Sequence, residues 1–139
     1  MSAIARFQLA LSIDPAHTPA YLGMAAVHRE QGDFRRALEA LERAPTKMQW
    51  NGCAMDFSFA IAFHRAFILS EQHRSDGFQG DLSTLRVALE EAQALGCVPV
   101  QAPEEQRRLE QALGLDPSRD RKLGAIGKLL TEVRRLQES

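Results

Sequence analysis

The sequence predicts an all-α protein built from antiparallel helical hairpins, with about seven helices. Three observations predict this fold class. Apolar residues recur at helical spacing on both sides of a short turn, Gln31-Gly32-Asp33. The 139 residues are 45% hydrophobic and 25% charged, which is the composition of an ordinary folded domain. Finally, Phe59, Phe63 and Phe67 repeat every four residues and so mark one side of a long central helix.

The residues around the turn define the first hairpin, with expected helices at Thr18–Gln31 and Phe34–Ala44. Apolar residues three and four positions apart mark one side of each helix: Tyr21, Met24, Ala25 and His28, then Phe34, Ala37, Leu38, Leu41 and Ala44. Gly32 can adopt the left-handed conformation that ends a helix, and Asp33 can cap the next one. Because the connection is so short, the two helices must lie antiparallel and pack on each other.

The large and small residues of this hairpin are spaced as in the tetratricopeptide repeat, which it resembles. That repeat is a helical hairpin with a period of about 34 residues. The matching positions are Tyr21, Met24, Ala25, His28, Gly32, Ala37, Leu41 and Ala44. His28 stands where the repeat has its second aromatic residue, and Ala25 where it has a glycine. The resemblance implies a short superhelix of stacked hairpins that binds another polypeptide.

The same frame extends to the N-terminus. The residues 34 positions before Ala37, Leu41 and Ala44 are Ala3, Phe7 and Ala10. We therefore expect residues 2–12 to be the second helix of a repeat whose first helix is missing. Its apolar side then has no partner, so either the chain is part of a longer array or a second subunit covers this edge.

The segment after the hairpin departs from the repeat. We expect a linker at Thr46–Gly52 and a long helix at Gly52–His73 that is apolar on more than one side. A helix of this kind is normally buried on several sides. Two interpretations of its aromatic stripe stay open. It packs in the core, or it lines a second groove formed by Phe59, Phe63, His64, Arg65 and Phe67.

Three more helices are expected, at Leu82–Leu95 (ended by Gly96), Pro103–Leu113 and Arg119–Gln137. Residues 112–117 echo residues 10–15 at an offset of 102, three repeat lengths, which extends a weaker resemblance over residues 103–130. The polar side of the last helix carries Arg121, Lys122, Lys128, Arg134 and Arg135. This helix either caps the array with that side in water or binds an acidic partner. We expect one domain, regular over residues 1–48 and divergent over residues 49–139.

Composition and motifs exclude several function classes. The formal net charge of −1 provides no field that attracts nucleic acid or an anionic membrane. No apolar run reaches the ~20 residues of a membrane span, and the N-terminus lacks the pattern of a signal peptide. Cys53 and Cys97 lack metal-ligand spacing, so we expect free thiols in a reducing cytoplasm. No pattern of an active site occurs, and we expect no catalysis, no cofactor and no metal.

The function class that remains is binding to a protein partner. The first helix of each hairpin lines the inner side of a stacked array. The groove positions on Thr18–Gln31 are Leu22, Gly23, Ala26, Arg29 and Glu30. We expect an adaptor or scaffold whose apolar groove holds a peptide or helix of a partner, or this chain's own last helix. The alternatives are a secretion-type chaperone and an accessory domain of an enzyme with a site near His64 and Arg65.

Overall fold

The computed structural model describes residues 2–50, 53–75, 82–97 and 119–138, together with Glu104, Arg108 and Ala112, which are helical. Six helices lie in these ranges: α1 (Ala3–Ile13), α2 (Thr18–Glu30), α3 (Phe34–Arg43), α4 (Ser58–Ser75), α5 (Leu82–Cys97) and α7 (Arg119–Glu138). The predicted all-α class is confirmed. The described part holds six of the roughly seven expected helices, because the helix expected at Pro103–Leu113 falls mostly outside it.

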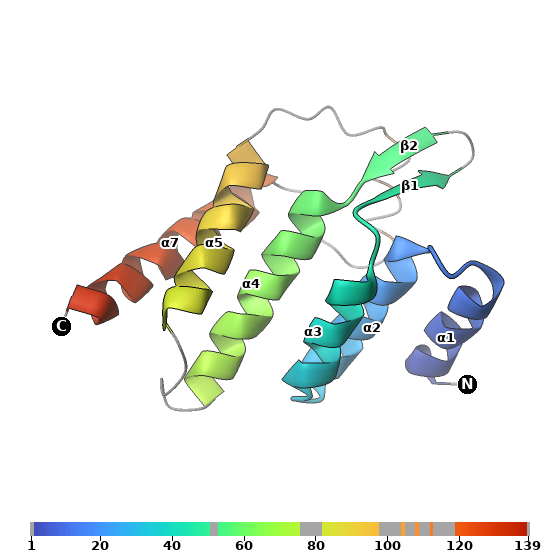
Figure 1. The fold of residues 1–139 in the computed structure, drawn as a ribbon, viewed down its shortest axis with the longest axis horizontal. Coiled ribbons are helices and arrows are strands. Elements are labelled where there is room, and N and C mark those ends of the chain that lie inside the picture. The colour runs from blue at the N-terminus through green and yellow to red at the C-terminus, as the bar shows by residue number, and fades with distance from the viewer. Residues whose placement is uncertain are drawn as a thin grey trace.

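The helices form a row in which each packs on the next (Figure 1). α4 stands in the middle, with α1, α2 and α3 on one side and α5 and α7 on the other, and the two termini lie at opposite ends. α1 packs on α2, α2 on α3, α3 on α4, α4 on α5, and α5 on α7. Stacking of successive helices in this way is the arrangement that the repeat resemblance implies.

The turn of the first hairpin forms as its residues predict. Gly32 has a φ of 78°, the left-handed conformation that favours glycine. The side chain of Asp33 accepts a hydrogen bond of 3.2 Å from the backbone N–H of Arg36 and so caps α3. The interface between α2 and α3 contains the buried alanines Ala25, Ala37 and Ala40. Because these side chains are small, the two helices can approach closely.

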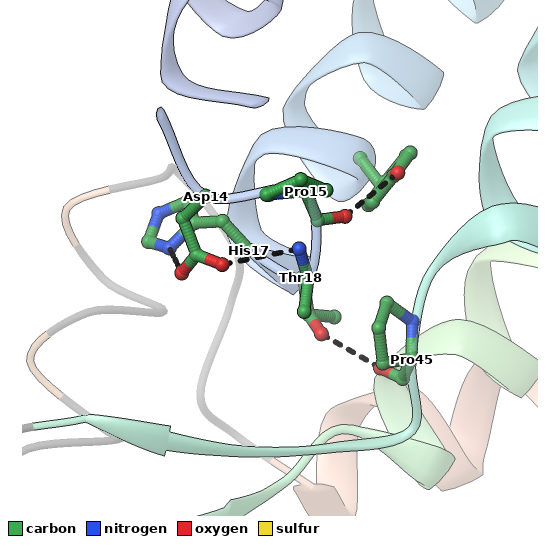
Figure 2. Close-up of polar contacts among 7 residues, drawn as sticks. Asp14, Pro15, His17, Thr18 and Pro45 are labelled. Carbon is green, nitrogen blue, oxygen red and sulfur yellow. Dashed lines mark hydrogen bonds and ion pairs between the residues drawn. The ribbon is translucent and has the colours of Figure 1, made fainter. Parts of the chain in front are cut away.

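Polar contacts close the other end of the hairpin (Figure 2). The hydroxyl of Thr18, at the start of α2, donates a hydrogen bond of 2.7 Å to the carbonyl of Pro45, which follows α3. The hydroxyl of Tyr21 donates one of 3.0 Å to the carbonyl of Pro15. Nδ1 of His17 lies 3.9 Å from a carboxylate oxygen of Asp14. The first contact holds the start of α2 against the end of α3, and the other two fix the connection from α1 to α2.

The linker predicted at Thr46–Gly52 is wrong, because a β-hairpin occupies this region. Strand β1 (Lys47–Trp50) pairs antiparallel with β2 (Cys53–Asp56), with Met48 opposite Met55. Met48, Met55 and the following Phe57 are buried in the first apolar cluster. α4 therefore begins at Ser58 and not near Gly52. Among the side chains that the structure describes, each strand buries one methionine, so the alternation that identifies a strand in a sequence is too short to see.

Two apolar clusters share the central helix α4. The first joins α2, α3 and the β-hairpin to one side of α4: Leu22, Ala25, Ala37, Ala40, Leu41, Met48, Met55, Phe57, Ala60 and Ile68. The second joins another side of α4 to α5 and α7: Ala66, Leu85, Ala88, Leu89, Ala92, Ile126, Leu130 and Val133. The prediction that this helix is buried on several sides is therefore confirmed.

Two boundaries differ from those expected. α4 continues to Ser75, so the loop predicted from Glu71 begins later. Gly96 does not end α5 but lies inside it. A Cβ atom at Gly96 would lie 2.6 Å from a methyl of Leu123 and 2.7 Å from the ring of Phe59, so this glycine permits a close approach of α7 and α4. None of the helices described is long and apolar enough to span a bilayer.

Candidate functional site

Side chains of α2, α4 and α7 meet on one face of the molecule. The guanidinium of Arg29 on α2 lies 5.6 Å from the centre of the Phe67 ring on α4. The ammonium of Lys122 on α7 lies 5.4 Å from the centre of the Phe63 ring. The two rings are stacked on each other at 5.7 Å. We call this surface the aromatic face, and its residues are Arg29, Phe63, His64, Phe67, Glu71 and Lys122.

The two cations of the aromatic face, Arg29 and Lys122, lie over phenylalanine rings. A cation above an aromatic ring is stabilised by about 0.5–2 kcal/mol, depending on its exposure to water. Arg29 is also 3.8 Å from a carboxylate oxygen of Glu71, which joins α2 to α4. Lys122 is only 7% exposed, an unusual position for a lysine. The face thus carries two cations that are fixed in place and partly removed from water.

His64 lies within reach of both cations. Its ring meets Phe63 edge-on, with 5.5 Å between the ring centres. Burial, and then the charges of Lys122 and Arg29, lower the pKa of His64 from 6.5 to about 4. The imidazole is therefore neutral at pH 7. Its Nε2 atom is buried and makes no hydrogen bond with the described residues.

An open groove of about 390 Å³ continues the aromatic face between α4 and α7. Its lining comes from both helices: Phe67, Ser70, Glu71, Arg74, Ala125, Lys128, Leu129 and Glu132. Arg74 and Glu132 lie 3.7 Å apart and link the two helices. A groove of this size is within the range of about 300–1,000 Å³ that is usual for binding sites. It offers an apolar floor with charges of both signs at its edge.

The five groove positions predicted on α2 separate in the structure. Leu22 is buried in the first apolar cluster. Gly23 faces the ring of Phe7 on α1, where a Cβ atom would lie at 2.3 Å. Ala26 is half-buried and Glu30 is exposed. Arg29 is the position that joins the aromatic face.

The second predicted groove forms only in part. The rings of Phe59, Phe63 and Phe67 follow one another along α4, with 6.1 Å and 5.7 Å between successive ring centres. Phe59 and Phe63 also pack against the second apolar cluster. Arg65 is exposed and stands roughly 200° around the helix from Phe67. His64 and Arg65 therefore do not form a joint site. The structure instead connects the two predicted grooves, since Arg29 of the first lies on Phe67 of the second.

Lys122 was missed as a site residue because it is predicted on the solvated side of the last helix, and that prediction is wrong. A signal for its burial is present in the sequence. Lys122 precedes Ile126 by four residues and Leu130 by eight, so it lies on the apolar side of the helix. A lysine at such a position is buried when a neighbouring helix supplies a partner, here the ring of Phe63.

The N-terminal edge also differs from expectation. Phe7 does not face outward but packs on Gly23 of α2. The large apolar side chains exposed on α1 are Leu9, at 53%, and Ile13, at 79%. The open side of α1 is therefore formed by Leu9 and Ile13 more than by Phe7.

No group of three histidine, cysteine, aspartate or glutamate side chains that could hold a metal ion occurs among the described residues. The side chains of Cys53 and Cys97 lie outside the described part, so the expectation of free thiols stays a prediction.

Stacked antiparallel helices of this kind define a helical-repeat protein. A family model described as tetratricopeptide repeat matches residues 2–49, which hold α1, α2, α3 and most of β1. This N-terminal segment belongs to the tetratricopeptide repeat family, whose repeats are in general protein–protein interaction modules. No curated protein and no solved structure matches the chain.

Proposed function

We propose that this chain is a non-catalytic adaptor that holds a segment of a partner polypeptide on the aromatic face. One observation carries the proposal. Arg29 of α2 and Lys122 of α7 lie on neighbouring phenylalanine rings of α4, so three helices that are distant in the sequence build one surface. Aromatic residues, phenylalanine included, and arginine are enriched at the cores of protein interfaces.

The chemistry of the face favours a particular kind of segment. The rings of Phe63 and Phe67 offer a contact surface for an apolar side chain, and the adjoining groove extends it along α7. Arg29, Lys122 and Lys128 favour a carboxylate nearby. The lysine and asparagine with which some family members hold a terminal carboxylate are replaced here by Leu22 and Ala26. The partner's carboxylate is then expected on a side chain within the segment.

Peptide selection on the immobilised full chain tests this proposal. Peptides from a random displayed pool are selected, and the affinity of the best one is measured by fluorescence anisotropy. Phe67→Ala removes the central ring and should weaken binding at least about tenfold, which is about 1.4 kcal/mol. Lys128→Glu should weaken the binding of peptides that contain a carboxylate.

Arg65→Glu is the matched control, because Arg65 is on the same helix but points away from the face. It should change the affinity less than about twofold, near 0.4 kcal/mol. Equal loss in Arg65→Glu and Phe67→Ala, with both variants folded by circular dichroism, contradicts the proposed location.

Self-association is a second, separate expectation, based on the exposed Leu9 and Ile13 of α1. A second copy that covers this edge would give a molecular mass that rises with concentration in light scattering. Leu9→Lys should abolish that rise. A constant monomer mass in the unaltered chain contradicts it.

A further inference from the structure

A second open groove lies between α1 and α3 and shares no residue with the aromatic face. Its volume is about 420 Å³. Met24 and His28 of α2 form part of its floor, Ile4 and Leu11 lie on the α1 wall, and Arg36 and Arg43 on the α3 wall. We call it the α1–α3 groove.

His28 of α2 belongs to the lining of the groove. His28 stands at the second aromatic position of the repeat, and an imidazole ring is smaller and more polar than the ring of tyrosine or phenylalanine. The side chain is only 8% exposed. Its Nδ1 atom is buried and makes no hydrogen bond with the described residues.

The shape of the groove favours a chain segment over a compact molecule. Residues 4 to 11 line one wall and residues 36 to 43 line the other. Each wall therefore runs for about two helical turns, or roughly 10 Å. A peptide backbone has a hydrogen-bond donor and an acceptor in every amide, so it can pair with His28 whichever tautomer is present.

The charges on the α3 wall indicate which kind of side chain the bound segment carries. Arg36 is 3.4 Å from the carboxylate of Asp33 and Glu39 is 3.9 Å from Arg35. Arg43 makes no ion pair with any residue that the structure describes. Its guanidinium favours a carboxylate on the bound segment.

We propose that the α1–α3 groove is a second docking site, which takes an acidic–apolar segment of a partner polypeptide. The segment places an apolar side chain between Ile4, Leu11 and Met24, a backbone amide at His28 and a carboxylate at Arg43. This site is independent of the aromatic face, so one chain could hold two segments at once.

A nuclear magnetic resonance titration of the isotope-labelled full chain tests the proposal. The probe is an acetylated tetrapeptide amide with a leucine–glutamate centre flanked by alanines, and glutamine replaces glutamate in its matched partner. We expect the backbone amides of Met24, His28 and Arg43 to shift, with a dissociation constant of about 1 mM. The glutamine peptide should bind about fivefold more weakly, because it lacks the charge.

Three variants locate the effect. His28→Tyr restores the ring of the repeat, fills the groove and should abolish the shifts while the thermal midpoint is kept. Arg43→Gln should reduce the affinity for the glutamate peptide to the affinity for the glutamine peptide. Arg6→Gln, on α1 with an exposed side chain that does not line the groove, should change nothing.

Several results overturn the second site. One is the absence of shifts at these residues with peptide at about 10 mM, ten times the expected dissociation constant. Others are an equal response to the two peptides and unchanged shifts in His28→Tyr. Shifts confined to Phe63 and Phe67 would assign the peptide to the aromatic face and would leave the α1–α3 groove without a ligand.

Discussion

The repeat half of the molecule, α1 to α3, and the second half, α4, α5 and α7, reach the same packing by different means. In the repeat half, Ala25 and Ala37 lie at motif positions, and a family model recognises the segment. In the second half, Ala88 and Ala92 of α5 are equally buried, yet the family match does not extend there. The comparison teaches that small residues at helix contacts produce stacked helices even where the motif is lost.

The halves differ more in their polar residues. The repeat half buries Thr18 in a hydrogen bond that closes the hairpin. The second half buries Lys122, which lies over an aromatic ring, and has a neutral His64 beside it. The first arrangement stabilises the fold. The second fixes a lysine ammonium over an aromatic ring on a face that three helices build, which is more useful for binding than for stability.

The largest expected effect tests whether the two halves depend on each other. Ala37→Asp and Ala92→Asp each put a carboxylate at a position that is 0% exposed. Each should cost about 4 kcal/mol or more and prevent stable folding. Because α4 belongs to both apolar clusters, either variant should remove the helical signal of the whole chain in far-ultraviolet circular dichroism.

Ala94→Asp is the control, since Ala94 is exposed on α5. It should keep a near-native melting temperature. A stable Ala37→Asp variant would disprove the packing of α2 on α3. Loss of only half of the helical signal would show that the halves fold separately.

The next effect concerns the second half alone. The pKa of His64 is about 4 in the folded chain and near 6.5 when unfolded, so the unfolded chain binds the proton more readily. The stability contributed by the neutral histidine is complete above about pH 6.5 and is lost as the pH falls towards 4. Between about pH 7.5 and about pH 5 the loss should be up to about 2 kcal/mol.

Urea unfolding at both pH values measures this loss, and His64→Gln provides the reference, because glutamine does not titrate. The difference in stability between the two pH values should be smaller in the variant by about that amount. An identical difference in the two proteins would contradict the burial of His64 among cations.

A smaller effect tests the closure of the repeat hairpin. Thr18→Val keeps the shape of the side chain but leaves the carbonyl of Pro45 without its donor, which should cost about 1–2 kcal/mol. Thr131→Val is the control, because the Thr131 hydroxyl donates within an exposed turn of α7 to the carbonyl of Gly127. Chemical denaturation should show little change in that variant. Equal losses would mean that Thr18 does not close the hairpin.

The smallest effect compares a glycine from each half. Gly32→Ala meets no atom within 4 Å but has to adopt a φ of 78°, so it should destabilise by about 1 kcal/mol. Gly124→Ala lies in α7 with equal space around it, and should stabilise by about 0.5–1 kcal/mol. Thermal melts of the two variants should therefore move in opposite directions. A shift of both in the same direction would contradict the assignment of Gly32 to the turn.

Much of the helical framework was predictable from local patterns. The turn at Gly32, the cap at Asp33 and the spacing of Ala37 and Leu41 are short-range signals, and the structure confirms the hairpin they predict. The β-hairpin was not predictable, because Met48 and Met55 become a pair only when the strands lie side by side. The candidate site was predicted in pieces, with Arg29 in one groove and Phe67 in another.

The sequence by itself determined which segments become helices and that the first hairpin is a tetratricopeptide repeat, because helix formation depends on residues three and four positions apart. The tertiary structure decided which side chains are buried. Leu22 does not line a groove because it packs in the first apolar cluster, and Lys122 is buried with its ammonium over the ring of Phe63. Burial depends on segments that are distant in the chain. The periodic pattern of one helix does not show which distant segment packs against it.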